Sequence, residues 1–411
     1  MSRIISFYLL VILLHACGTK SVPELEEFRL ISNAEMPILA WYSVQKEDIS
    51  LLRFKELKEA GFTHSFSDGY GSNVTMLNAL NLAEEVGLKL IIATPELHNV
   101  PTETAKRFKD HPANGGYFLR DEPSAWEFED LAAWARKIES VDKIHPCYLN
   151  LFPNYASLEM LQTSSYEEYV DRFDKVVDLP YLSFDHYPIL EVGKGNYTIR
   201  PNFYENLEII SKKAKEVNKP FWAFAMVTSH PPYPIPTMAH IRFQMYSNLL
   251  YGAQGLQYFT YWTPKDVTQH EFYYGPISQD GKKTEIYDLV KKMNKEIQGL
   301  TPVFLGANVL SVEHLGDQIP QGTKAFTKLP AGIKRLEVSG SNGAIVSLLQ
   351  NNGKYFFVIL NRDIQQKMLV DIDLANGVKR VTKDARLIAT TDVVNKIKVE
   401  PADILIYAWP Q

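Results

Sequence analysis

Between residues 36 and 301 the sequence alternates short apolar runs with longer amphipathic segments, and this rhythm limits the possible folds more than any other feature. In the amphipathic segments the apolar residues recur every three or four positions, as in helices, and Gly61 and Gly87 follow two of them as C-caps. The predicted helices include residues 48–61, 76–87, 125–139, 203–217 and 285–300. The apolar runs predict eight strands, at residues 37–42, 62–67, 88–94, 116–120, 145–151, 181–185, 221–226 and 255–261.

Eight strand–helix pairs in about 260 residues match the size of a (β/α)8 TIM barrel. A doubly wound sheet shows the same alternation, but it usually carries a Gly-rich phosphate-binding turn after its first strand. Here the first strand continues into AWYSVQKED, which contains no such turn. We therefore predict an α/β fold in which residues 36–301 form a TIM barrel.

The remainder of the chain, residues 302–411, has the pattern of β-structure. The stretch GAIVSLLQNNGKYFFVILNR contains two strand-like runs around Asn352 and Gly353, a dipeptide typical of tight hairpin turns. Two later stretches, KMLVDIDLANGVKRVT and VEPADILIYAW, continue the alternation. We predict a small all-β, sandwich-like domain that carries no catalytic residues.

The N-terminus has the pattern of an export signal. Arg3 precedes an apolar run at residues 4–14, which is too short to span a membrane as a helix. The run ends in LHACG, which resembles the lipobox of bacterial lipoproteins, and this resemblance implies that Cys17 is lipidated. A plain secretory signal or an uncleaved anchor is the alternative. We expect a signal peptide at 1–17, a linker at 18–35, and a protein anchored to a bacterial outer membrane, on its periplasmic or external face.

Composition and motifs argue against several classes of protein. The formal net charge of −5 provides no basic surface for nucleic acid. No residues have the spacing of a zinc site, and neither a Walker loop nor a G-x-S-x-G elbow occurs. Removal of the signal would leave Cys147 alone, so an intrachain disulfide could not form. We predict no metal and no cofactor, and the oligomeric state stays open.

Polar and aromatic residues gather where the predicted strands end. In a TIM barrel these ends meet at one mouth, which is where active sites lie. The clearest case is GYFLRDEP, an apolar run that ends on Arg120, Asp121 and Glu122 because it opens into a polar site and not into the core. The other candidates at strand ends are Trp41, Glu96, Asn150, Asp185, His186, Tyr187, His230, Tyr261 and Trp262.

This set of residues is typical of sugar chemistry. Hydrolysis of a glycosidic bond needs one carboxylic acid to protonate the leaving oxygen, and a second carboxylate that attacks, activates water or stabilises the developing cation. We predict that Glu122 is the acid, that Asp185 is its partner, and that Trp262 is a flat platform for a sugar ring. Asp121 and the remaining candidates would bind the carbohydrate substrate. As structural alternatives, Asp121 could form a rim ion pair and Asp185 could hydrogen-bond to loop backbone.

Two stretches near the end of the predicted barrel, YGAQGLQYFTYWTP and GPISQDGKKTEIYD, add a family resemblance. Together with the Asp-Glu-Pro after the fourth strand, they resemble clan A (β/α)8 glycoside hydrolases such as the family 42 β-galactosidases, in the lipoprotein form exported by Bacteroidetes. The resemblance implies that Glu122 is the acid/base glutamate, with Asp121 in the place of the usual Asn. The nucleophile of the clan is a glutamate at the end of the seventh strand, where FWAFAMVTSH has no carboxylate.

The absent glutamate leaves three hypotheses open. Asp185, on the sixth strand, could supply the second carboxylate. Alternatively, Asp121 and Glu122 resemble the Asp–Glu pair of the substrate-assisted N-acetylhexosaminidases, in which the Asp orients the acetamido group of the substrate and the Glu is the acid. The third hypothesis is a non-catalytic glycan-binding lipoprotein on a hydrolase scaffold.

Overall fold

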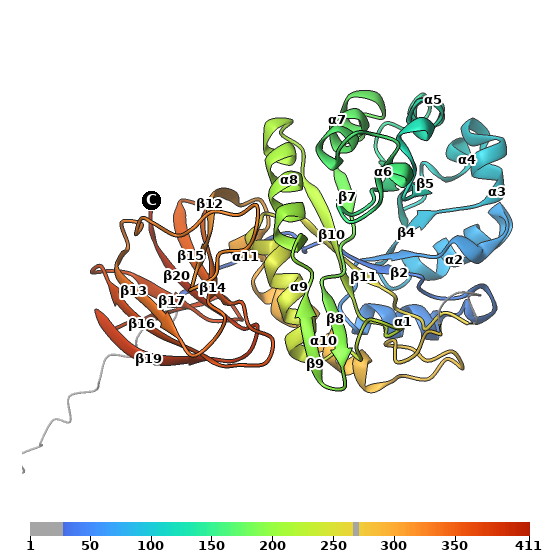
Figure 1. The fold of residues 1–411 in the computed structure, drawn as a ribbon. Coiled ribbons are helices and arrows are strands. Elements are labelled where there is room, and N and C mark those ends of the chain that lie inside the picture. Colours follow the sequence, from blue (N-terminus) through green and yellow to red (C-terminus); the bar gives the residue numbers. More distant parts are fainter. Residues whose placement is uncertain (1–27, 266–270) are drawn as a thin grey trace, which may run out of the picture.

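A computed structural model describes residues 28–265 and 271–411, which form a parallel barrel beside a β domain (Figure 1). The barrel strands lie in the order β6-β5-β4-β3-β2-β11-β10-β7. Between β6 and β7 the barrel is closed by a bridge from Leu151 to Phe184 and by the Leu151 N–H, which donates to the Ser183 carbonyl at 2.8 Å. The predicted TIM barrel is confirmed, with strands β2 (Ile38–Trp41), β3 (His64–Phe66), β4 (Lys89–Ile92), β5 (Asn114–Asp121), β6 (Cys147–Asn150), β7 (Leu182–Phe184), β10 (Phe221–Met226) and β11 (Gly255–Phe259).

Helices cover the outside of the barrel. Several begin at a Ser or Thr whose hydroxyl accepts a backbone N–H of the first turn, as Ser165 does from Glu168 at 3.1 Å. The longer ones are α1 (Leu51–Glu59), α2 (Asn73–Glu84), α4 (Pro101–Phe108), α5 (Phe128–Glu139), α7 (Tyr166–Val176), α8 (Phe203–Glu216), α9 (Met238–Leu250) and α10 (Glu285–Gly299). The short ones are η1 (Lys46–Asp48), η2 (Asp68–Tyr70), α3 (Pro95–Asn99), η3 (Ala125–Glu127), α6 (Leu158–Leu161) and α11 (Thr301–Phe304). None of the described helices is long and apolar enough to cross a membrane.

The β domain contains two antiparallel sheets. One has seven strands in the order β1-β18-β17-β20-β15-β14-β12, and the other has three in the order β13-β16-β19. The predicted hairpin is confirmed, since Asn352 (φ 46°) and Gly353 (φ 71°) connect β14 to β15. The strands are β1 (Phe28–Arg29), β12 (Asn308–Leu315), β13 (Ile333–Ser339), β14 (Ala344–Asn351), β15 (Lys354–Asn361), β16 (Met368–Leu374), β17 (Lys379–Val381), β18 (Arg386–Ala389), β19 (Val393–Val399) and β20 (Ile404–Pro410).

The seven-stranded sheet is buried on both faces. Along β15 the side chains alternate, so that Phe357 and Ile359 face the three-stranded sheet, whereas Phe356 and Val358 belong to the core shared with the barrel helices. The side chains of α9 are also buried nearly all round, because this helix lies between the barrel and the sheet. A helix without a polar face has no amphipathic pattern, which explains why the sequence did not single it out.

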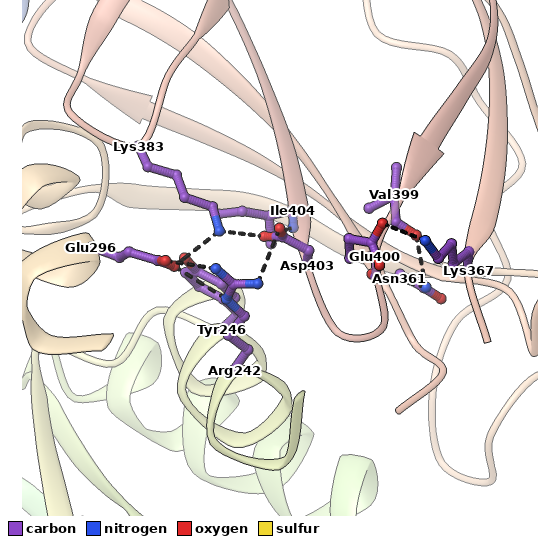
Figure 2. Close-up of polar contacts among 10 residues, drawn as sticks. All are labelled: Arg242, Tyr246, Glu296, Asn361, Lys367, Lys383, Val399, Glu400, Asp403 and Ile404. Carbon is purple, nitrogen blue, oxygen red and sulfur yellow. Dashed lines mark hydrogen bonds and ion pairs between the residues drawn. The ribbon is translucent and has the colours of Figure 1, made fainter. Parts of the chain in front are cut away.

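An ion network joins the barrel helices to the β domain (Figure 2). The Arg242 guanidinium on α9 donates to Glu296 on α10 at 2.6 Å and pairs with Asp403 of the β domain at 3.3 Å. The Lys383 ammonium lies 2.9 Å from Glu296 and 2.7 Å from Asp403, and the Tyr246 hydroxyl donates to Glu296 at 2.9 Å. Each carboxylate therefore contacts two cations, one from each domain.

Two segments connect distant parts of the chain. Residues 28 and 29, which fall in the predicted linker, pair antiparallel with β18 of the seven-stranded sheet. A hairpin of β8 (Ile189–Gly193) and β9 (Asn196–Ile199) is inserted after β7, and at its turn the Gly195 carbonyl accepts the Gln365 side-chain amide of the β domain at 3.2 Å. The predicted signal peptide and Cys17 lie outside the described residues.

Candidate active site

Three carboxyl groups meet at the C-terminal ends of β5 and β7. The Asn150 side-chain amide, at the end of β6, donates to Asp121 Oδ1 at 3.2 Å and to Asp185 Oδ1 at 3.0 Å. The Glu122 carboxyl is hydrogen-bonded to that of Asp185. The Glu122 N–H donates to the Asn150 carbonyl at 2.8 Å, and its φ of 47° lies in the left-handed region, which turns this residue from the line of the strand toward Asp185.

The carboxyl groups hold protons more strongly than ordinary ones. Burial, and then the nearby charge of Asp121, raise the pKa of Glu122 to about 7, and its hydrogen bond to Asp185 opposes the shift. Asp185 is 6% exposed, and burial together with the Glu122 and Asp121 charges raises its pKa well above the usual value. Asp121 keeps an accessible surface, but protein surrounds it at the barrel mouth, so desolvation raises its pKa to about 6. At neutral pH the cluster therefore retains a proton that it can donate.

A buried polar network fixes the amide that links these carboxyls. The Ser183 hydroxyl donates to Asn150 Oδ1 at 2.9 Å, which leaves the amide NH2 pointing at Asp121 and Asp185. Gln257 donates to Ser183 Oγ at 2.8 Å from across the barrel. Because every member of this chain has a partner, the orientation of Asn150 is defined by the barrel interior and not by a mobile loop.

Four other predicted residues lie inside the barrel or on the loops at its mouth. Trp41 packs inside the barrel against Phe66, with ring centroids 4.2 Å apart, and only a small part of it is exposed. His186 and Tyr187, which follow Asp185 directly, are buried, as is His230 in the loop after β10. Tyr233 packs against both Tyr187 and His230, and His186 Nδ1 is hydrogen-bonded to Asn206 at 3.0 Å.

Three predicted residues lie elsewhere. Trp262 and Tyr261 are each 1% exposed in the core between barrel and helices, and the Arg53 guanidinium covers the Trp262 ring at 5.1 Å. Contrary to our expectation, Trp262 therefore offers no free face to a sugar. Glu96 Oε1 accepts the Asn73 N–H at 3.2 Å and so caps α2, which is a structural role.

Several residues at the mouth were not predicted. Asp68, exposed on η2 after β3, is close enough to raise the pKa of Asp121 and of Tyr42 by its charge. Its signal was present in the sequence, because SFSDG ends a strand on an acid as GYFLRDE does. Arg200 also reaches the mouth, where its Cζ lies 4.3 Å from the centre of the Tyr155 ring. It follows the β8–β9 hairpin, and no periodic pattern marks such a position.

The end of β10, the seventh barrel strand, carries no carboxylate in this structure either. Thr228 lies there. Its hydroxyl donates to the Thr260 carbonyl at 3.0 Å and lies 2.8 Å from the Thr260 hydroxyl. Within residues 28–265 and 271–411 no group of three or more His, Cys, Asp or Glu side chains is arranged to hold a metal ion. The chemistry that these residues offer is acid–base chemistry by the carboxyl cluster.

A cavity of about 600 Å³ lies away from this cluster, between α8, the start of β10 and β12. Its lining includes Pro220 and Phe221, which mark the N-terminal ends of the barrel strands. Because active sites of TIM barrels lie at the opposite, C-terminal end, we do not assign this cavity to the site.

The fold and the position of the cluster define a TIM barrel with an acidic site at its C-terminal mouth and an appended β domain. The chain is similar in fold to a β-galactosidase from Bacillus circulans sp. alkalophilus, with a TM-score of 0.62 at 9% identity over 91% of this chain and 99% of that one. A family 42 β-galactosidase from G. stearothermophilus has a TM-score of 0.58 at 9% identity, over 94% of this chain and 100% of that one. A glycoside hydrolase family 5 protein from Bacteroides vulgatus has a TM-score of 0.55 at 14% identity, over 91% of this chain and 89% of that one. No family model matches the sequence, and no curated protein matches it.

Proposed function

We propose that this protein is a glycoside hydrolase in which Glu122 is the general acid. The observation that carries the proposal is the position of Glu122 at the end of β5 beside Asp121 and Asp185, where burial raises its pKa to about 7. Such a group is about half protonated at neutral pH and can transfer its proton to the oxygen of a leaving sugar. The β-galactosidases and the family 5 protein of similar fold support the same reaction class.

The hydrogen bond between Glu122 and Asp185 bears on the mechanism. Carboxyls that flank a glycosidic bond lie about 5–5.5 Å apart in retaining enzymes and about 6.5–9.5 Å apart in inverting ones. Here the two carboxyls are close enough for each to influence the proton of the other, which favours a supporting role for Asp185 over attack on a sugar carbon. In the geometry described, Asp185 would serve to hold the proton of Glu122, and action as nucleophile or base would require the pair to separate.

The same contact favours a second candidate, substrate-assisted cleavage of N-acetylhexosaminides. In this reaction the acetamido oxygen of the substrate attacks the anomeric carbon, while Glu122 protonates the departing oxygen. The Glu122 carboxylate then takes a proton from water as that water attacks the anomeric carbon and opens the oxazolinium intermediate, which restores the acetamido group. No second protein carboxylate has to reach the anomeric carbon, and Asp121, beside Glu122, would orient the acetamido group.

A matched pair of aryl glycosides separates the two mechanisms. If the substrate assists, the 2-acetamido glycoside should be cleaved at least about 10³-fold faster than its 2-hydroxy counterpart, because the latter lacks the nucleophile. A thiazoline analogue should then inhibit. Equal rates on the two glycosides, with no inhibition, would contradict substrate assistance and leave Asp185 as the partner carboxylate.

The raised pKa of Glu122 predicts a pH dependence. Since the general acid must carry its proton, kcat/KM should fall as the pH rises through about 7. Asp121→Asn removes a charge that raises this pKa, so the descending limb should move to lower pH. The pH profiles of both proteins test this, with exposed Asp130→Asn on α5 as the control. An unshifted limb in Asp121→Asn would show that the charge of Asp121 does not act on the acid.

We also propose that the protein is exported and anchored to the membrane through a lipid on Cys17. The support is the lipobox-like LHACG that follows the apolar run. Expression in a bacterial host with labelled palmitate should give a labelled protein in the membrane fraction, whereas Cys17→Ser should be unlabelled. Equal labelling of the two proteins would exclude Cys17 as the attachment point.

A further inference from the structure

A guanidinium group lies where three loops of the barrel mouth meet. Arg200 follows β9, and its Nε donates to the Tyr187 carbonyl at 3.2 Å while its Nη2 donates to the Tyr233 hydroxyl at 3.2 Å. Its Cζ lies 4.3 Å from the centre of the Tyr155 ring. Tyr155 follows β6, Tyr187 follows β7 and Tyr233 follows β10, so Arg200 is held by all three loops.

Arg200 has no carboxylate partner. Among the described residues, no Asp or Glu oxygen lies within 4.0 Å of its guanidinium nitrogens, and its Nη1 donates to none of them. Arg53, which also lies over an aromatic ring, differs because it pairs with Glu56 at 2.8 Å and with Asp48 at 3.9 Å. A half-buried arginine that keeps a free N–H edge can bind an anion from outside the chain.

Tyr155 links Arg200 to the neighbourhood of the carboxyl cluster. The Tyr155 ring packs edge-on against His186, with centroids 4.9 Å apart, and the charge of the neighbouring Asp185 helps burial to raise the pKa of Tyr155. Tyr155 is 36% exposed and Arg200 is half-buried, so each residue keeps some surface in contact with solvent. Arg200 and Tyr155 thus belong to the same mouth as the carboxyl cluster, on the side of Asp185.

We propose that the substrate carries a negatively charged substituent, a uronic acid carboxylate or a sulfate ester, which is bound by the Arg200 guanidinium. A planar guanidinium binds such groups through paired, charge-assisted hydrogen bonds. The carboxyl cluster does not prevent this, because its raised pKa values keep part of it uncharged near neutral pH. The inference rests on the proposed function, since it names the substrate class of the same site.

Binding to the full-length Glu122→Gln variant tests this without turnover. By calorimetry, aryl glucuronides and galacturonides should bind at least about tenfold more tightly than the matching glucosides and galactosides, as expected for a hydrogen bond to a charged group. Glycosides with a 6-sulfate form the second arm, and the arm with the larger preference identifies the anion. The preference should weaken as salt is added. Equal affinity for charged and neutral members would overturn the inference.

Arg200→Gln in the same background provides the second measurement. It should remove the preference for charged glycosides and keep the affinity for neutral ones within about twofold, while Arg200→Lys should keep part of the preference. Arg107→Gln on α4 changes the net charge equally at an exposed site and should have no effect. Equal loss of both affinities in Arg200→Gln would mean that Arg200 only holds the loops, and would overturn the inference. Failure of the wild-type protein to cleave any glycoside that it binds would instead refute the hydrolase and leave the binding preference standing.

Discussion

Replacing Glu122 with glutamine should lower kcat/KM on the best aryl glycoside by about 10²–10⁴-fold, the usual contribution of general acid catalysis. Glutamine keeps the shape of the side chain but has no proton to give to the leaving oxygen. The loss should therefore shrink for glycosides with very acidic leaving groups, which depart without protonation. Rates on a panel of leaving groups, measured for wild type and variant, check both expectations.

Glu129→Gln, an exposed position on α5 a few residues further along, is the matched control and should have wild-type activity. Unchanged turnover in Glu122→Gln would refute the assignment of the acid. If the wild-type protein itself binds glycans but releases no reducing ends from any of them, the barrel is a glycan-binding scaffold and not an enzyme.

Glu296→Gln should lower the free energy of unfolding by about 3 kcal/mol, the lower end of the range for breaking a buried ion pair. The Glu296 side chain is 11% exposed and that of Arg242 is 13% exposed, so little water can replace the lost charge. The variant leaves Arg242 and Lys383 to share Asp403 alone (Figure 2). Urea denaturation of both proteins at pH 7 measures the difference.

The pH dependence of this loss has a definite sign. Although burial opposes it, the hydrogen bond from Arg242 and the charge of Lys383 hold the pKa of Glu296 below its usual value. Its contribution is thus complete above the unfolded pKa of about 4.3 and disappears as the pH falls further. Exposed Glu285→Gln, on the same helix, should cost under about 1 kcal/mol. A similar cost at the two positions would mean that the network adds nothing to stability.

Much of the barrel could be predicted because its strands are continuous apolar runs and because parallel strands place their ends at one mouth. That rule is sufficient to bring Asp121, Glu122, Asn150 and Asp185 together from three separate strands. What the rule did not supply is their separation. Whether two carboxyls share a proton or flank a sugar depends on a few ångströms of backbone, such as the left-handed turn at Glu122.

The same rule placed Tyr261 and Trp262 at the mouth, where the structure does not have them. Beyond Phe259, the last paired residue of β11, the Tyr261 and Trp262 N–H groups still donate to the Trp41 and Tyr42 carbonyls. Both side chains nevertheless pack in the core between barrel and helices, Trp262 under Arg53. The position of Arg200 depends on the β8–β9 hairpin, whose place in space follows from tertiary contacts and not from local periodicity. Side chains on long connections are therefore the part of this site that only a structure supplies.

Because the seven-stranded sheet is covered on both faces, the β domain cannot be separated from the barrel without exposing apolar surface. A domain joined only by a flexible linker can be removed, because the surface of the other domain is already exposed to solvent. Here the same strands supply side chains to both apolar cores, so deletion of residues 302–411 would strip the barrel helices of their cover. The barrel and the β domain therefore form one structural unit, in which a substitution on the shared strands can disturb both cores.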